Sequence, residues 1–148
     1  MDITSKITGA TVALDTIPII YFIEENRKYF KIVEKIFRCI ASGKTSAVIS
    51  TITLLEVLVL PYRVNNTKLA EAYKNILLFS PGIIVVPLSS FIAEEAARLR
   101  AKYVINTPDA IQIATTLHSG GKYFITNDLR LKKVLETSVM ILDDYVDL

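Results

Sequence analysis

Short apolar runs rich in β-branched residues alternate along the chain with longer segments of helical periodicity. The runs are "TVAL" at 11–14, "TSAVIS" at 45–50, "GIIVVP" at 82–87, "KYFIT" at 122–126 and "SVMIL" at 138–142. The clearest intervening segment is "YFKIVEKIFRCIASGK" at 29–44, where Phe30, Val33, Phe37 and Ile40 recur at helical spacing. Strands that alternate with helices are typical of βαβ units. The chain is therefore predicted to be α/β, a three-layer α/β/α sandwich with a mostly parallel central sheet and a single domain at 1–148.

Composition excludes several classes of protein. Hydrophobic residues make up 51% and charged residues 22% of the chain, which is incompatible with disorder. The net charge of +2 gives no overall basic field, so any site for a polyanion must be local. The single cysteine, Cys39, cannot form an intramolecular disulfide, and the N-terminus has no secretory signal, so we expect a cytoplasmic protein. The uncharged stretch 75–93 contains two prolines and a glycine, and we expect no membrane span.

Three aspartates follow strands or begin helices. Asp15 follows the first run and Asp128 the fourth, whereas Asp109 falls in the first turn of "TPDAIQIATTLH". Ligands of parallel α/β sheets bind beyond the carboxyl ends of the strands, where these acids could share one rim. Each also has a simpler interpretation: Asp15 and Asp128 as helix caps, and Asp109 as an acid that complements the helix dipole behind a Thr107 N-cap and Pro108.

Glu56 is harder to explain by capping. It lies inside "ITLLEVLVL", an apolar segment that we expect to be a helix buried on most sides. An isolated carboxylate there would cost several kcal/mol unless it were paired, protonated or bound to a metal. The alternatives are an exposed stripe on that helix or a lysine partner.

If Glu56 and the three aspartates lie together at one rim of the sheet, they require a cation. Four carboxylates in proximity cannot all ionise without one, and hard oxygen ligands suit Mg²⁺ or Mn²⁺. Such ions lower the pKa of a bound water and neutralise charge on a leaving oxygen. The pattern therefore predicts metal-assisted phosphate chemistry, for which Arg130, two residues beyond Asp128, is the best candidate phosphate contact.

The order of these motifs resembles the PIN domain family, the ribonuclease fold found in many VapC-type toxins. The matching blocks are "ALDTIPIIYFIE", "STITLLEVL", "ARLRAKYVINTPDAIQIATTLHSGGKYFITND" and "VMILDDY". The third block is the most specific, because an arginine-bearing helix, a "DA" helix start, a double glycine and a "TND" strand exit recur in family order. The first block departs from the pattern, since the family more often has an asparagine or serine shortly after its first aspartate, where this chain has "DTIP".

The resemblance implies an activity and a set of site residues. It implies hydrolysis of RNA phosphodiesters by metal-activated water, with Mg²⁺ or Mn²⁺ held by Asp15, Glu56, Asp109 and Asp128. Thr126 and Asn127 match the polar positions beside the fourth acid, where they would bind a metal water or the nucleophile.

The resemblance also implies partners: a homodimer and an antitoxin protein. The segments "RKYFKIVEKIFRCI" and "TKLAEAYKNILLF" are expected to form an αα arm with a groove for an amphipathic helix, although ordinary core packing explains them as well. Two alternatives to a nuclease remain. One is a catalytically silent PIN-like module that binds RNA or protein, and the other is a receiver- or phosphatase-like domain phosphorylated on Asp15, which lacks the second acid that such domains need near the first strand.

Overall fold

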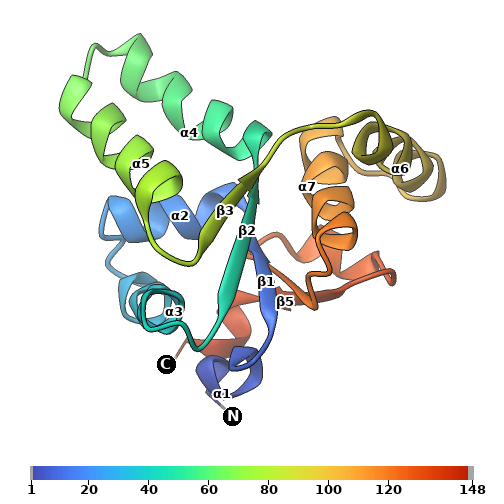
Figure 1. The fold of residues 1–148 in the computed structure, drawn as a ribbon, viewed down its shortest axis with the longest axis horizontal. Helices are drawn as coiled ribbons and strands as arrows, with labels where there is room; N and C mark the ends of the chain where they lie inside the picture. The colour runs from blue at the N-terminus through green and yellow to red at the C-terminus, as the bar shows by residue number, and fades with distance from the viewer. Residues whose placement is uncertain (1, 147–148) are drawn as a thin grey trace.

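Five parallel strands form the centre of the molecule, in the order β3-β2-β1-β4-β5 (Figure 1). The computed structural model describes residues 2–146. The strands are Thr11–Leu14 (β1), Ser46–Ser50 (β2), Ile83–Val86 (β3), Tyr123–Thr126 (β4) and Ser138–Ile141 (β5). Each strand falls within one of the apolar runs, so the predicted parallel sheet is confirmed. Because β1 is flanked by β2 and β4, the carboxyl ends of these three strands lie side by side.

Helices cover both faces of the sheet. Val12 and Leu14 of β1 contribute to one apolar core, and Ala13 between them contributes to the other, as the period of a strand requires. The first core is completed mainly from α2, α3 and α5, and the second from α6 and α7. The three-layer sandwich is therefore confirmed. The helices are α1 (Ile3–Ile7), α2 (Thr16–Ile23), α3 (Phe30–Ala41), α4 (Thr51–Arg63), α5 (Thr67–Phe79), α6 (Ser90–Lys102), α7 (Thr107–His118) and the 3₁₀ turns η1 (Leu129–Lys133) and η2 (Leu142–Tyr145).

The N-cap predicted for α7 was wrong by one residue. Asn106 is the cap, and its side chain accepts a hydrogen bond from the backbone N–H of Asp109 at 2.9 Å. Thr107 is already helical, and its hydroxyl accepts a hydrogen bond from Arg100 instead. Asparagine and threonine both cap helices well, so the sequence alone does not distinguish two such neighbours.

α4 is half exposed, contrary to the expectation that it is buried on most sides. Leu55 is 57% exposed and Leu60 is 55% exposed, whereas only Thr53, Val57 and Pro61 are buried. The reason is visible in Figure 1, where α4 leaves the end of β2 and runs outward as the first half of a hairpin with α5.

The predicted arm of α3 and α5 is also wrong, since the hairpin pairs α5 with α4. α3 packs against α1 and α2, and five of its side chains are buried. The role of core cover that was left open for α3 is therefore the one observed.

The uncharged stretch 75–93 comprises the end of α5, a turn, β3 and the start of α6, as predicted. In the described part of the chain, no helix has the length and apolar character needed to cross a membrane.

Candidate active site

The carboxyl ends of the central strands carry the acids singled out in the sequence. Asp15 follows β1, Asp128 follows β4 after Thr126 and Asn127, and Glu56 lies in the second turn of α4, which begins where β2 ends. Asp109 lies in the first turn of α7, which packs across β1, β2 and β4. The charge on each of the other three acids raises the pKa of Asp109, so all three act electrostatically on this carboxyl group.

Asp15 is the most deeply buried of the four, with 7% of its surface exposed. Its Oδ1 accepts a hydrogen bond from the backbone N–H of Thr16 at 2.7 Å, and its Oδ2 accepts one from the hydroxyl of Thr126 at 2.6 Å. Burial raises the pKa of Asp15, these two hydrogen bonds lower it, and Glu56 and Asp128 raise it further. Asp15 caps α2, as the simpler interpretation predicted, but each carboxylate oxygen keeps lone pairs that a cation can share.

Asp109 is half-buried and is not itself a cap, because Asn106 fills that role. Burial, together with the smaller effects of the charges of Asp15, Asp128 and Glu56, raises the pKa of Asp109 to about 6. Near neutral pH, burial and like charge therefore destabilise the ionised form of Asp109.

Asp128 forms an ion pair with Arg130. The Arg130 guanidinium donates to both of its carboxylate oxygens, with Nη2 2.6 Å from Oδ2 and Nε 3.0 Å from Oδ1. These hydrogen bonds hold the pKa of Asp128 below its ordinary value. Asp128 also caps η1 by accepting a hydrogen bond from the Arg130 backbone N–H, as its simpler interpretation predicted.

Glu56 is neither isolated nor paired with a lysine. Its Oε1 accepts hydrogen bonds from the hydroxyl of Thr16 at 2.8 Å and from Nε2 of Gln112 at 3.0 Å. No ion pair to Glu56 is found among residues 2–146. The cost of half-burying this carboxylate is offset by neutral donors, which leave its charge uncompensated.

The two polar residues beside the fourth acid have different surroundings. Thr126 is fully buried, donates to Asp15 and accepts from the backbone N–H of Asp128 at 3.1 Å, so it links two acids of the rim. Asn127 instead faces η2: its Oδ1 accepts from the backbone N–H of Asp143 at 3.0 Å, and its Nδ2 lies 3.4 Å from the hydroxyl of Tyr21.

Three residues of the site were not predicted from the sequence: Thr16, Thr53 and Gln112. Thr16 and Gln112 hydrogen-bond Glu56, and the amide of Gln112 also contacts the hydroxyls of both threonines. The available signal was a glutamine three residues beyond Asp109, on the same face of the predicted helix.

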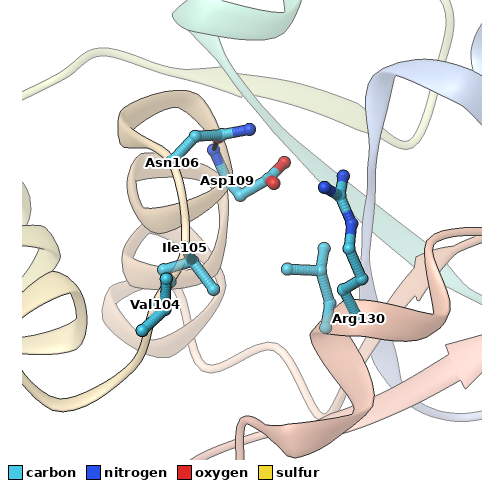
Figure 2. Close-up of a pocket in the computed structure, with 6 residues that line it drawn as sticks. Val104, Ile105, Asn106, Asp109 and Arg130 are labelled. Atoms are coloured by element: carbon cyan, nitrogen blue, oxygen red, sulfur yellow. Dashed lines mark hydrogen bonds between the residues drawn. The ribbon is translucent and has the colours of Figure 1, made fainter.

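A pocket of about 330 Å³ opens beside the rim, lined by residues 104–106 and by Asp109, Arg130 and Leu131. Figure 2 shows the Asp109 carboxylate and the Arg130 guanidinium facing each other across it. An anion that enters this pocket would meet the cation of Arg130 next to the acid with the raised pKa.

The donor set suits a hard divalent cation. All four acids supply oxygen, and Mg²⁺ is typically held by only one or two carboxylates, with waters and substrate phosphates completing its octahedron. As the side chains stand, no three acidic, histidine or cysteine residues within 2–146 lie close enough together to hold an ion. The four acids therefore suit an ion whose ligands are mainly waters and substrate oxygens, and not an ion coordinated entirely by protein side chains.

The fold and the rim define a class: a three-layer α/β protein with acids beyond the carboxyl ends of its central strands. The PIN domain model matches residues 12–136, and the chain belongs to the PIN domain family. The resemblance seen in the sequence is thereby confirmed. No curated protein matches the chain.

Solved structures share this fold. VapBC2 from Rickettsia felis, bound to a DNA fragment from its promoter, is 19% identical over 88% of this chain and 98% of that chain, with a TM-score of 0.63. DNA-bound VapBC from Salmonella typhimurium is 17% identical over 90% and 98%, with a TM-score of 0.65. VapC20 from Mycobacterium tuberculosis, a Sarcin-Ricin loop cleaving toxin, is 17% identical over 86% and 98%, also with a TM-score of 0.65. At these identities the likeness extends to the fold alone.

Proposed function

We propose that the chain is a Mg²⁺- or Mn²⁺-dependent endoribonuclease with Asp15, Glu56, Asp109 and Asp128 as its metal-binding and catalytic acids. The observation that carries this proposal is the placement of the four acids beyond the carboxyl ends of β1, β2 and β4 and in the first turn of α7. The raised pKa of Asp109, to which the other three carboxylates contribute, supports it. A cation among these acids would offset their mutual repulsion. Membership of the PIN domain family supports the same activity.

Several residues of the site have distinct tasks in this proposal. The bound ion supplies a water of lowered pKa and neutralises charge on the leaving oxygen. Asp15, held by Thr126 and the Thr16 backbone, is the rigid ligand. Arg130, which donates to both oxygens of Asp128, would bind an RNA phosphate, and Asp128 would be among the residues that hold the ion. Asn127 anchors η2 and thereby the loop that carries Asp128, and its amide contacts the nucleophile or a metal water only if it leaves Asp143.

We further propose that the chain is the toxin of a toxin–antitoxin pair and acts in the cytoplasm as a homodimer. The structural neighbours from Rickettsia felis and Salmonella typhimurium are VapBC complexes, and the neighbour from Mycobacterium tuberculosis is a Sarcin-Ricin loop cleaving toxin. An antitoxin protein is the partner that this likeness suggests.

The test is cleavage of a panel of labelled RNAs by the purified protein with Mg²⁺, with Mn²⁺ and with EDTA, in parallel with the Asp109→Asn variant. We expect cleavage that depends on metal and is lost in the variant, with 5′-phosphate and 3′-hydroxyl products. Cleavage that survives both EDTA and the substitution would reject the assignment.

A catalytically silent, RNA- or protein-binding module is the second candidate. It is favoured by one observation: Arg130 donates hydrogen bonds to both oxygens of Asp128, which competes with metal binding by that acid. RNA binding without cleavage in any metal, by protein that also fails to bind Mn²⁺ in calorimetry, would establish this alternative.

A further inference from the structure

Gln112 joins three helices of the site through a single amide group. It lies in α7, one turn beyond Asp109, and only 3% of its surface is exposed. Its Nε2 is 3.0 Å from Oε1 of Glu56, 3.0 Å from Oγ1 of Thr16 and 3.1 Å from Oγ1 of Thr53. Thr16 belongs to α2, and Thr53 and Glu56 belong to α4, so the amide ties both helices to α7.

The chemistry of Glu56 determines which way this amide faces. An ionised carboxylate only accepts hydrogen bonds, so the amide nitrogen of Gln112 must face it and the amide oxygen must point away. That oxygen is buried, and it has no hydrogen-bond partner within residues 2–146. Buried polar atoms in native proteins are seldom left unpaired, and an exception requires an explanation.

We propose that Gln112 is a positioning residue that fixes the Glu56 carboxylate for metal binding, an inference that rests on the proposed function. The unpaired amide oxygen is the consequence of aiming the nitrogen at Glu56. Glutamate has several rotatable bonds, and α4 is exposed along its outer face, so Glu56 has few other constraints. The hydroxyl of Thr16 also donates to Glu56, and Thr16 follows Asp15 directly. Gln112 and Thr16 therefore fix the carboxylate of Glu56 relative to Asp15.

The first test compares the Mn²⁺ affinity of the intact protein by calorimetry in the wild type, Gln112→Met and Thr115→Val. Methionine keeps the length and volume of glutamine and removes its hydrogen bonds. Thr115 is the matched control: it is 1% exposed in the same helix, but its hydroxyl donates to the Ile111 carbonyl and does not touch Glu56. Both changes alter stability, whereas only the loss of Gln112 alters the position of Glu56.

We expect Gln112→Met to weaken Mn²⁺ binding about 10- to 100-fold, the range typical of residues that orient a metal ligand. Thr115→Val should leave the affinity unchanged within about twofold, because it removes no contact to a ligand. Equal affinity of the wild type and Gln112→Met would overturn the inference. Gln112→Asn, whose amide is too short to reach Glu56, is measured in the same way if the methionine variant does not fold.

A second test needs no metal and separates this inference from the proposed function. Urea unfolding of the wild type, Gln112→Met, Glu56→Ala and the double variant in EDTA forms a double-mutant cycle. We expect the double variant to lose less stability than the two single variants predict together, because both remove the same hydrogen bond. If the wild type binds no Mn²⁺, the proposed metal site fails, and this cycle alone decides the role of Gln112: additive effects reject it, and coupled effects retain it.

Discussion

Among the side chains of the site, Asp109 has the clearest effect on the free energy of unfolding of the metal-free protein. An aspartate in an unfolded chain has a pKa of about 3.9, whereas burial and like charge raise the pKa of Asp109 in the native state to about 6. The native state therefore binds the proton more tightly than the unfolded state. Its contribution to stability is fully present below about pH 4 and is lost as the pH rises to about 6.

Asp109→Asn should consequently stabilise the metal-free protein at neutral pH. One unit of pKa shift corresponds to about 1.4 kcal/mol. Solvent screening of this half-buried group and loss of the favourable helix dipole offset part of the gain, so we expect roughly 1–2 kcal/mol at pH 7.5. At pH 4 the aspartate is largely protonated, and the effect should nearly vanish. Urea unfolding in EDTA at both pH values measures this difference. An equal effect at pH 4 and pH 7.5 would show that the carboxylate charge is not its cause.

The guanidinium of Arg130 sits at the opposite side of the pocket and is expected to act on substrate. Arg130→Gln should raise KM for RNA more than it lowers kcat, and should reduce the salt dependence of binding by about one counterion. Arg38→Gln is a matched control, because both arginine side chains are 77% exposed and each bonds one carboxylate. Cleavage kinetics at several KCl concentrations distinguish the two variants. An identical response of both would mean that Arg130 contacts no phosphate.

At the scale of single elements, the start of α7 places Asp109. The Asn106 side chain accepts from the Asp109 backbone N–H, so the cap and the acid share one hydrogen bond. Asn106→Ala should reduce the free energy of unfolding by about 1 kcal/mol, the usual value of an N-cap. Thr107→Ala is the control and should cost less, since the Thr107 hydroxyl only accepts from exposed Arg100. A larger loss for Thr107→Ala in thermal or urea unfolding would contradict the observed cap.

The elements that sequence predicts well are those specified by local chemistry. All five strands lie within β-branched runs. The caps of α4 and α6 are Ser50 and Ser89, a residue type that commonly caps helices. α1 escaped notice because its five residues are too few to show a period. The family also followed from short motifs such as "TPDA" and "TND". Each motif is an unbroken stretch of sequence, so it can be recognised without any knowledge of tertiary contacts.

Other features of the fold and of the site could not be predicted from the sequence, chiefly because they depend on contacts between distant segments. Gln112 acquires its role only when α7 lies against Glu56, 56 positions earlier in the chain. The exposure of α4 was missed because an apolar helix has the same sequence pattern whether its own chain or another molecule covers it. The hold of Arg130 on Asp128 is local, but it depends on the 3₁₀ turn η1, whose geometry has no clear sequence signature.

At the scale of the whole molecule, the α4–α5 hairpin projects from the sandwich (Figure 1). It exposes apolar side chains. Leu55, Val59 and Tyr62 recur at positions i, i+4 and i+7 and are 57%, 43% and 57% exposed, so they form one stripe along α4. Scattered apolar residues on a surface are ordinary, whereas a continuous stripe marks an interface. This stripe is the surface that we expect the proposed homodimer to bury.

Val59 lies at the centre of the stripe, and Val59→Glu tests this expectation. In a two-fold symmetric interface each substitution occurs twice, so two carboxylates would be buried without partners and the dimer should dissociate. The fold should be retained, because Val59 is exposed in the single chain. The control is Leu135→Glu, at an 81% exposed position just after η1 and outside the hairpin. Sedimentation at several concentrations should give a dimer for the wild type and Leu135→Glu, and a monomer for Val59→Glu. A dimer that persists in Val59→Glu would place the interface elsewhere, and a monomeric wild type would mean that the stripe is left for a different partner.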